Sequence, residues 1–594
     1  MVKDTIEYQS EVCEILEKFQ RDSTNLLPIL LEVQEMHPKN YVSEEIAVFI
    51  AKYLGISIGR VAAAISFFSA LSSEPRGKNI IRVCKSTACM VNNGENLLNI
   101  LKKELNVPVG ETSKDELFTL ELTECIGACD VAPAFKINEN VYGNLTREKI
   151  IEIINDYKSG VESKTSKQIS FTELKNDKNT SSTNIISKNF KNYNPESLSE
   201  YKSLGGFKAL EKSFQMTHDS IIESIDLSGL RGRGGAGYPT GKKLRQAKAP
   251  KNDRKVIICN ADEGEPGTFK DRQFIEHDPF KILEGMIITG NVIDATEGYI
   301  YVRHEYNHLH RRLHNVVSEA RKAGLLGKNI LGSGYDFDIK VFSGGGAYIC
   351  GEGGALIESM EGKIGYPRVK PPYTKQCGLE QLPTLVINVE TLCSIATILD
   401  YGPEKYAKHG TKASPGTKLI SLSGNVSQPG AFEVDFGITI NDIIENLGRG
   451  VKDQKHAKFI QLGGASGPLI PKKDFDVKLC YNDLKNRGYQ MGSGAVVVCD
   501  EDQNVVEYLK NVYEFFEHES CGKCTPCREG NHLIVDRLDT ILKGEGTQKD
   551  LDTIKRLALH MKDSSFCGGG KTAPTALLSA FRHFNEDFSR AIGE

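Results

Sequence analysis

The chain of 594 residues has no tryptophan, and it also lacks the features that would place it in a membrane or on a nucleic acid. No apolar run approaches the roughly 18 residues of a transmembrane helix. The first residues, MVKDTIEYQS, have no apolar core of a secretory signal. The formal net charge of -4 provides no basic footprint for nucleic acid. We therefore expect a cytoplasmic protein with no membrane span and no nucleic-acid partner.

Cysteine, in contrast, is plentiful. Cysteines in a cytoplasmic chain are more often metal ligands or buried apolar residues than disulfides. Of the fifteen here, eight fall in two tight groups. Those two groups are the first candidates for a metal-dependent function.

Hydrophobic periodicity and composition divide the chain, whose length suggests about four domains. Residues 11–75 have helical spacing, with Ser43 as a plausible N-cap, and alternating strands follow from residue 79. A stretch rich in Ser, Thr, Asn and Lys predicts a linker. We predict an α/β multidomain protein with these parts: 1–159, helical plus a small α/β unit; 160–197, linker; 198–412, larger α/β domain; 413–503, small β-rich domain; 504–594, helical domain.

A glycine-rich stretch, GLRGRGGAGYPTG (229–241), contains the pattern G-x-G-x-x-G. The Rossmann dinucleotide fold needs a strand before this pattern and a helix directly after it. Here a helix-like segment precedes the glycines, and Pro239 is expected to interrupt any helix that would cap a pyrophosphate. The sequence therefore excludes a Rossmann site. Glycines beside arginines and lysines still predict a backbone that approaches an anion closely.

Two further loops rich in glycine and acids lie in the same region, at 259–272 and 344–373. Each follows an apolar, strand-like segment. Ligand loops occupy this position in open α/β sheets. The three loops together predict a ligand site rather than an isolated flexible turn.

The stretches LRGRGGAGYPTG, ICNADEGEPGTFKDR, AYICGEGGALIESMEG and INVETL resemble the flavin- and NADH-binding subunit of respiratory complex I. The resemblance covers about 200–594. The first 150 residues resemble its thioredoxin-like [2Fe–2S] partner subunit. Fusion of the two is similar to the diaphorase subunit of NAD-reducing hydrogenases, and some motifs also sit close to NAD-linked formate dehydrogenases. We expect a thioredoxin-like N-terminal unit, an FMN/NAD(H) domain, a β-grasp-like domain and a C-terminal helical bundle holding a cluster.

The resemblance also implies roles for individual residues. The residues expected around the FMN phosphate and ring edge are Gly232, Arg233, Gly234 and Lys243. Those expected on the ribityl chain and isoalloxazine are Asn260, Asp262, Glu263 and Asn388. The nicotinamide would stack on the flavin between Glu265 and the loop Tyr348–Glu352, which contains Gly351, so that Glu265 and Glu352 are the expected catalytic residues. The adenine half is expected on Tyr238, Lys370 and Tyr373, although core packing is an alternative for the tyrosines.

Two departures from the family pattern bear on this site. Gly353 replaces a second acid, and an acid near the flavin repels anionic groups. Its absence leaves the choice between NADH and NADPH open. Ile387 replaces a usual asparagine and removes one polar contact.

The C-terminal cysteines Cys521, Cys524 and Cys527 have the spacing C-x2-C-x2-C. Three thiolates this close can hold three corners of a cuboidal cluster, with a remote fourth ligand. Cys567 is the candidate for that ligand, as in the family. Structural zinc sites more often combine two separate pairs, so the spacing favours [4Fe–4S].

The N-terminal cysteines form two pairs, Cys84 with Cys89 and Cys125 with Cys129. By spacing alone, a four-cysteine zinc site is nearly as good an interpretation as a [2Fe–2S] cluster. The resemblance favours [2Fe–2S].

These parts predict an NADH dehydrogenase of the diaphorase type. NADH gives two electrons as a hydride, iron–sulfur clusters accept one at a time, and a flavin converts between the two. Electrons would pass through the clusters to or from iron–sulfur and catalytic subunits of a hydrogenase or formate dehydrogenase. The alternatives are the NADH-input subunit of a complex I-like or electron-bifurcating complex, an NADPH-specific reductase, and a non-catalytic scaffold held by zinc.

Overall fold

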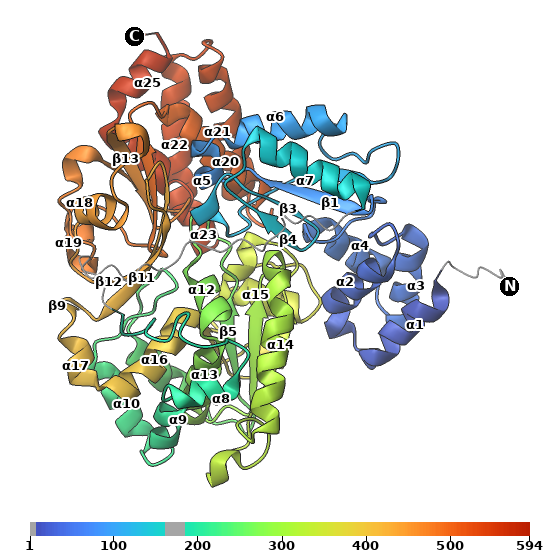
Figure 1. Ribbon diagram of the computed structural model, residues 1–594, viewed down its shortest axis with the longest axis vertical. Helices are drawn as coiled ribbons and strands as arrows, with labels where there is room; N and C mark the ends of the chain where they lie inside the picture. Colours follow the sequence, from blue (N-terminus) through green and yellow to red (C-terminus); the bar gives the residue numbers. More distant parts are fainter. Residues whose placement is uncertain (1–7, 161–183, 594) are drawn as a thin grey trace.

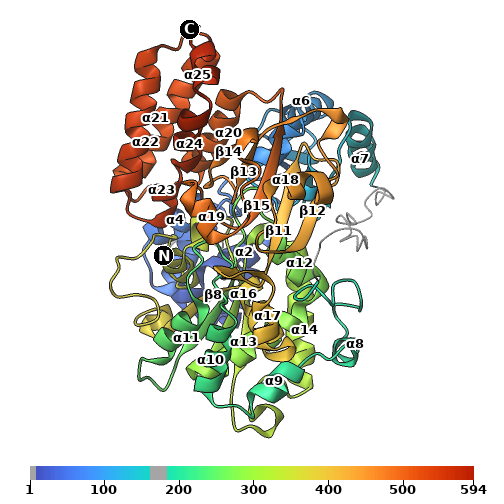
Figure 2. The same ribbon diagram turned by 90° about the vertical axis from the view of Figure 1, so that its left-hand side faces the viewer.

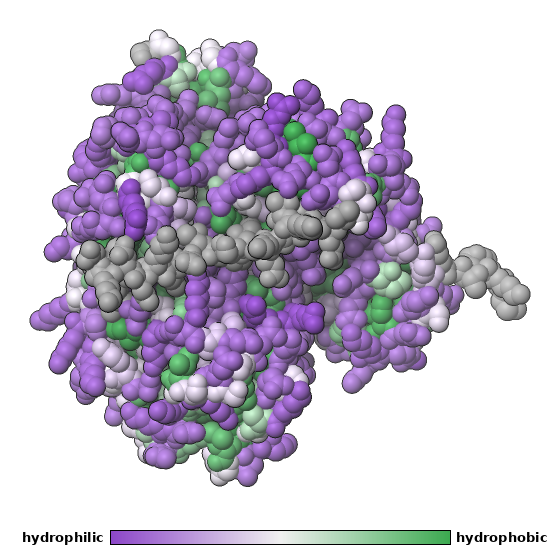
Figure 3. All heavy atoms as spheres, in the orientation of Figure 1, coloured by the Kyte–Doolittle hydropathy of each residue, from purple (hydrophilic) through white to green (hydrophobic). Residues whose placement is uncertain are grey.

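The computed structural model describes residues 8–160 and 184–593. Figure 1 shows four helices at one side, a small α/β unit beside them, a larger α/β domain below, and a β-rich domain and helical bundle above. Hydrophilic side chains cover most of the face drawn in Figure 3. Among the described helices, none has the length and apolar character needed to cross a bilayer.

The N-terminal helices are α1 (Gln9–Lys18), α2 (Leu26–Met36), α3 (Glu44–Leu54) and α4 (Ile58–Phe67). The Ser43 hydroxyl accepts a hydrogen bond from the Ile46 N–H at 3.3 Å, which confirms the predicted N-cap. The helices share one hydrophobic cluster with Ile258, Tyr301 and Leu356 of the large α/β domain. They therefore pack on that domain, although in sequence they adjoin the thioredoxin-like unit.

The thioredoxin-like unit has a sheet of order β2-β1-β3-β4, formed by β1 (Asn79–Cys84), β2 (Phe118–Thr123), β3 (Phe135–Ile137) and β4 (Asn140–Tyr142). Strands β1 and β2 are parallel. Helices α6 (Gly94–Leu105) and α7 (Arg147–Ser159) share its core. Because parallel strands end at the same edge, the segments after β1 and β2 bring their cysteines together.

The linker prediction is wrong at its C-terminal end. Residues 161–183 lie outside the described residues, but Ile186, Phe190 and Tyr193 are buried in the core of the large α/β domain. The buried Glu433 carboxylate accepts hydrogen bonds from backbone N–H groups here, including Ile186 N at 3.0 Å. A few apolar side chains and one buried acceptor are enough to anchor a segment that is polar by composition.

The large α/β domain has a parallel sheet of order β7-β6-β5-β8, formed by β5 (Val256–Ala261), β6 (Glu297–Val302), β7 (Asp338–Ser343) and β8 (Thr384–Asn388). One face packs on α10 (His218–Leu227), α11 (Thr240–Lys248), α13 (Pro279–Ile293), α14 (Asn307–Lys322) and α16 (Val389–Tyr401). The other face packs on α15 (Gly353–Met360) and the N-terminal helices. The strand order reverses between β5 and β8, and open α/β sheets bind ligands at such a point.

The glycine-rich segment differs in one respect from expectation. Helix α11 begins at Thr240, directly after Pro239, so Pro239 does not interrupt a helix. Proline is tolerated at the start of a helix because the first N–H groups have no intrahelical partner. The Rossmann interpretation remains excluded, since the element before the glycines is α10, a helix rather than a strand.

The β-rich domain forms a sheet of order β12-β11-β15-β13-β14 from β11 (Thr417–Gly424), β12 (Gly430–Asp435), β13 (Ala457–Leu462), β14 (Leu469–Pro471) and β15 (Ala495–Asp500). The C-terminal bundle contains α20 (Val505–His518), α21 (Thr525–Leu542), α22 (Gln548–Ser564), α24 (Thr575–His583) and α25 (Asn585–Ala591). Figure 2 shows α21, α22 and α24 side by side.

Candidate functional site

A cavity of about 260 Å³ opens at the reversal point of the parallel sheet. Asn260 is the second-last residue of β5, Asn388 is the last residue of β8, and the two are register partners. The predicted residues that line the cavity are Gly234, Asn260, Asp262, Glu263, Glu265, Tyr348, Gly351, Glu352 and Asn388. Ser493 comes from the β-rich domain and Thr572 from the C-terminal bundle. The cavity is thus assembled from three parts of the chain.

The loop after β5 is tied to the loop before α15. The Asn260 amide donates to the Gly351 carbonyl at 2.9 Å, and its oxygen accepts from the Asp262 N–H at 3.0 Å. Burial raises the pKa of Asp262 well above its usual value. The asparagine therefore fixes the two cavity loops relative to one another.

Glu263 is already engaged by its own domain. Its carboxylate accepts from the N–H groups of Asp271 at 2.8 Å and Arg272 at 3.1 Å, at the start of α12 (Lys270–His277). Burial raises the pKa of Glu263 to about 7. Its carboxylate caps a helix N-terminus, so only part of the residue is free to face a ligand.

Glu265 connects the cavity with two neighbouring domains. Its carboxylate accepts from the Tyr348 hydroxyl at 2.7 Å and from the Ser466 N–H at 2.8 Å. Tyr348 in turn packs edge-on against Phe515 of α20, with ring centroids 5.0 Å apart. Burial raises the pKa of Glu265.

Glu352, the other expected catalytic residue, is the N-cap of α15. One carboxylate oxygen accepts from Gly354 N at 2.8 Å and Ala355 N at 3.0 Å. The other pairs with the Lys370 ammonium at 2.5 Å. This arrangement gives Glu352 a structural function at the cavity wall and places Lys370 beside it.

The predicted residues outside the cavity lining are Gly232, Arg233, Tyr238, Lys243, Lys370 and Tyr373. The Arg233 side chain is buried and donates to the Arg231 and Thr417 carbonyls at 2.6 and 3.0 Å. Two nitrogens of its guanidinium are thus engaged within the protein, and the expected place of Arg233 around the FMN phosphate and ring edge stays a prediction. Gly232 instead pairs with Tyr238 through a backbone bond of 2.8 Å.

Tyr238 and Tyr373 are 41% and 49% exposed, so the core-packing alternative is wrong for both. Gln246 connects the two tyrosines through Lys375. Its side-chain oxygen accepts hydrogen bonds from the Tyr238 hydroxyl at 3.2 Å and from the Lys375 ammonium at 2.6 Å. The Lys375 ammonium is 5.2 Å from the Tyr373 ring centroid. Two accessible aromatic rings beside lysines suit a purine with attached phosphates.

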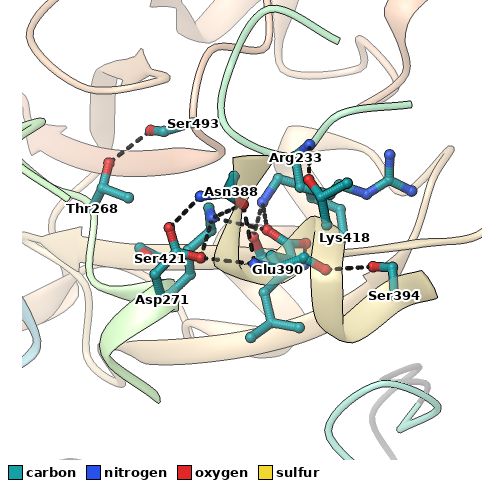
Figure 4. A network of polar contacts seen from close by, with 12 residues as sticks. Arg233, Thr268, Asp271, Asn388, Glu390, Ser394, Lys418, Ser421 and Ser493 are labelled. Carbon is teal, nitrogen blue, oxygen red and sulfur yellow. Dashed lines mark hydrogen bonds and ion pairs between the residues drawn. The ribbon is translucent and has the colours of Figure 1, made fainter. Parts of the chain in front are cut away.

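The sequence analysis missed a buried charge network in the cavity wall (Figure 4). The Lys270 ammonium contacts Asp271 at 2.7 Å and Glu390 at 3.0 Å, and Glu390 also pairs with Lys418 at 2.7 Å. Burial opposes the charge of Lys270, but attraction to the two acids keeps its pKa above the usual value. Lys270 and Asp271 are adjacent in the stretch GTFKDR. This pair of opposite charges was the signal in the sequence that could have indicated the network.

Lys243 provides a test of whether the site suits a flavin phosphate. Its ammonium donates to the Val386 carbonyl at 2.6 Å, and in the described part of the chain no carboxylate pairs with it. Burial and the nearby Lys375 lower its pKa to about 8. A buried cation without a counter-ion fits an anionic group, because burying an unpaired charge is costly.

Four cysteines line a second cavity: Cys521, Cys524, Cys527 and Cys567. Its wall also includes Phe516 and Phe566, and it shares Tyr348, Ile349 and Gly569 with the first cavity. Within residues 8–160 and 184–593, no group of three or more Cys, His, Asp or Glu converges on a single-ion site. Ligands of a cuboidal cluster need no such convergence, since each thiolate binds its own iron.

The N-terminal cysteines also meet in space. Cys84, Cys89, Cys125 and Cys129 are at most 3% exposed, and the Cys125 and Cys129 sulfurs are 3.3 Å apart. Hydrogen bonds from Cys129 and Cys84 hold the pKa of the Cys125 thiol well below its usual value. The same hydrogen bonds raise the pKa of the Cys84 and Cys129 thiols. The gathering of four buried thiols fits a two-iron cluster.

Three protein-family models match separate parts of the chain. Residues 225–397 match the Nuo51 FMN-binding domain, residues 12–158 the thioredoxin-like [2Fe-2S] ferredoxin, and residues 507–591 the NADH-ubiquinone oxidoreductase-F iron-sulfur binding region.

Individual proteins align over long stretches. NAD-reducing hydrogenase HoxS subunit alpha of Cupriavidus necator is 35% identical over 98% of this chain and 94% of its own length. NADP-reducing hydrogenase subunit HndC of Solidesulfovibrio fructosivorans is 43% identical over 69% of this chain and 84% of its own. A chain from a crystal structure of an NAD+-reducing [NiFe]-hydrogenase in the air-oxidized state superimposes with a TM-score of 0.84, at 28% identity, over 96% of this chain and 94% of that one.

Proposed function

Since this chain belongs to the family of flavin- and NADH-binding subunits found in NADH-quinone oxidoreductases and NAD-reducing hydrogenases, we propose that it is the diaphorase subunit of a hydrogenase complex. Its activity is hydride exchange between NAD(H) and FMN, coupled to one-electron transfer through [4Fe–4S] and [2Fe–2S] clusters. The observation that carries this function is the shared wall of the two cavities, formed by Tyr348, Ile349 and Gly569.

The residues of the chain position the reactants and exclude water. When bound, FMN accepts two electrons from NADH and releases them singly. Asn260 holds the two cavity loops together, and Glu265 orients the Tyr348 hydroxyl. Tyr348, packed on Phe515, closes the wall between the flavin cavity and the cysteine cavity. We propose the adenine half on the exposed rings of Tyr238 and Tyr373, with Lys370 near the nucleotide phosphates.

A hydrogenase partner is supported by the relatives reported above. The relative that spans 98% of this chain is named as a subunit of an NAD-reducing hydrogenase, and this supports NAD(H) as the nucleotide. A formate dehydrogenase partner stays a prediction from the sequence motifs. The three matching family models make the zinc-held scaffold the poorer interpretation, because all of them describe flavin or iron–sulfur regions.

Anaerobic titration of the protein with NADH and then with NADPH tests the proposed nucleotide. We expect stoichiometric NADH to bleach the flavin and to give iron–sulfur EPR signals, with NADPH at least about tenfold less effective, or about 1.4 kcal/mol. Stronger reduction by NADPH would contradict the proposed specificity. Protein without flavin and with bound zinc would contradict the redox function.

Substitution of Lys243 tests the proposed phosphate contact. A charge-assisted hydrogen bond contributes about 1.5–3 kcal/mol, so Lys243→Met is expected to weaken FMN binding roughly 10- to 100-fold. The pKa of Lys243 is about 8, so the ammonium is charged below that pH. Wild-type affinity is therefore expected to fall as pH rises from 7 to 9, and Lys243→Met is expected to lose this dependence.

Flavin fluorescence titration of the flavin-depleted protein measures both effects. Lys248→Met on the same helix is the control, because Lys248 pairs with Asp219 at 3.1 Å rather than with a ligand. An equal loss in both variants, or an unchanged pH profile in Lys243→Met, would show that Lys243 does not contact the phosphate.

A further inference from the structure

One arginine joins the [2Fe–2S] ligand loop to the flavin cavity. Arg303, directly after β6, donates to the Cys125 carbonyl at 2.6 Å and to the Glu263 carbonyl at 2.5 Å. Cys125 is a predicted cluster ligand, and Glu263 lines the cavity. A single guanidinium therefore holds a loop of each site.

A second arginine fastens the same ligand loop. Arg272 of α12 pairs with Asp130 at 3.0 Å and donates to the Gly127 carbonyl. Gly127 packs against the Tyr306 ring so closely that a Cβ at this position would overlap it. The Tyr306 hydroxyl in turn donates a hydrogen bond to the Glu263 carboxylate at 3.1 Å. The loop from Cys125 to Asp130 is thus fixed to the large α/β domain at several points.

Both guanidiniums are removed from water. The Arg303 and Arg272 side chains are 4% and 1% exposed. Arg303 pairs with Glu305 at 2.7 Å, and Arg272 with Glu276 at 3.3 Å. Charges in such surroundings act more strongly on one another than charges in water.

We propose that Arg303 and Arg272 are positioning residues that raise the reduction potential of the cluster at Cys84, Cys89, Cys125 and Cys129 and hold it against the flavin cavity. A reduced cluster carries one more negative charge than an oxidised one, and buried cations beside its ligand loop stabilise the reduced form. Removing either arginine also takes a cation away from the buried acids that pair with it. Both consequences lower the potential, so the direction of the effect is the same for either residue.

This inference rests on the [2Fe–2S] cluster and not on the proposed nucleotide or partner. The cluster can therefore be reduced chemically, with dithionite and redox mediators, and its EPR signal followed against potential. In Arg303→Gln and Arg272→Gln we expect at least a tenfold shift of the one-electron equilibrium towards the oxidised cluster, which is 59 mV. Failure of NADH to reduce the protein would contradict the proposed function without affecting this result.

Arg76→Gln is the matched control. Arg76 is also buried, at 5% side-chain exposure, and pairs with Glu121 at 2.7 Å. Its guanidinium donates to Glu121 and to the Ala70 and Leu71 carbonyls, none of which belongs to the loop from Cys125 to Asp130. A potential equal to wild type in both test variants, or an equal fall in Arg76→Gln, would overturn the proposal.

The variant Arg303→Lys distinguishes the effect of the positive charge from a failure to assemble the cluster. If Arg303→Gln assembles no cluster, the lysine variant still keeps a cation at this position. We expect the one-electron equilibrium between oxidised and reduced cluster in Arg303→Lys to stay within a factor of about two of wild type, because the positive charge is retained. A tenfold shift in Arg303→Lys would contradict the electrostatic account.

Discussion

Cys527→Ser is expected to stop electrons leaving the flavin while leaving reduction of the flavin by NADH intact. Cys527 lines the cysteine cavity, and burial raises the pKa of its thiol to about 11. Its proton is therefore held tightly unless iron replaces it. Loss of an outer partner of a metal ligand already costs roughly 10- to 100-fold in affinity or activity, so loss of a ligand is expected to reduce electron delivery at least about 100-fold.

The measurement combines stopped-flow absorbance with EPR of the NADH-reduced protein. Flavin bleaching is expected to remain within a few-fold of wild type, and the [4Fe–4S] signal is expected to vanish. Cys377→Ser is the control, since Cys377 lies outside both groups and donates to Gln381 at 2.7 Å, which a serine hydroxyl can also do. Normal electron delivery in Cys527→Ser would show that the exit path avoids this cavity.

Lys270→Met is expected to give the largest loss of stability in the flavin cavity. The substitution leaves Asp271 and Glu390 buried with one cation fewer (Figure 4). Removing one partner of a buried ion pair costs about 3–5 kcal/mol, because the other charge stays without compensation. We expect α12 and the start of α16 to open more readily by this amount, with loss of FMN from the cavity.

Hydrogen exchange of the amides in these helices measures the local free energy of opening. Lys363→Met is the control, since Lys363 is 47% exposed and pairs with Glu361 at 2.8 Å. An exposed pair contributes about 0–1 kcal/mol. Adding Asp271→Asn to Lys270→Met is expected to recover part of the stability. A loss below about 1 kcal/mol in Lys270→Met would show that water replaces the lysine.

Two sequence arguments succeeded because they depend on local chemistry. The spacing of Cys521, Cys524 and Cys527 brings three thiols together whatever the rest of the fold does, and Cys567 lines the same cavity. The acidic glycine loops were predicted to be ligand loops because each follows a strand, and both line the cavity at the edge of the parallel sheet.

Other features required the tertiary structure. The direction of the Arg233 side chain is set by Tyr406 and Thr417, which are far from it in sequence. The polar segment at Phe190 and Tyr193 is anchored by a core and a buried acid that its own composition does not reveal.

The sequence by itself determined the cofactors, because these are encoded in short stretches with fixed spacing, and it predicted the cysteine ligands. Only the tertiary structure decided which side chains line the cavity at the edge of the parallel sheet, that this cavity and the four-cysteine cavity share a wall, and that Arg303 joins the Cys125 loop to the same site. The physical reason is that such contacts depend on which buried charges find partners from distant segments, and a buried charge without a partner is too costly to keep.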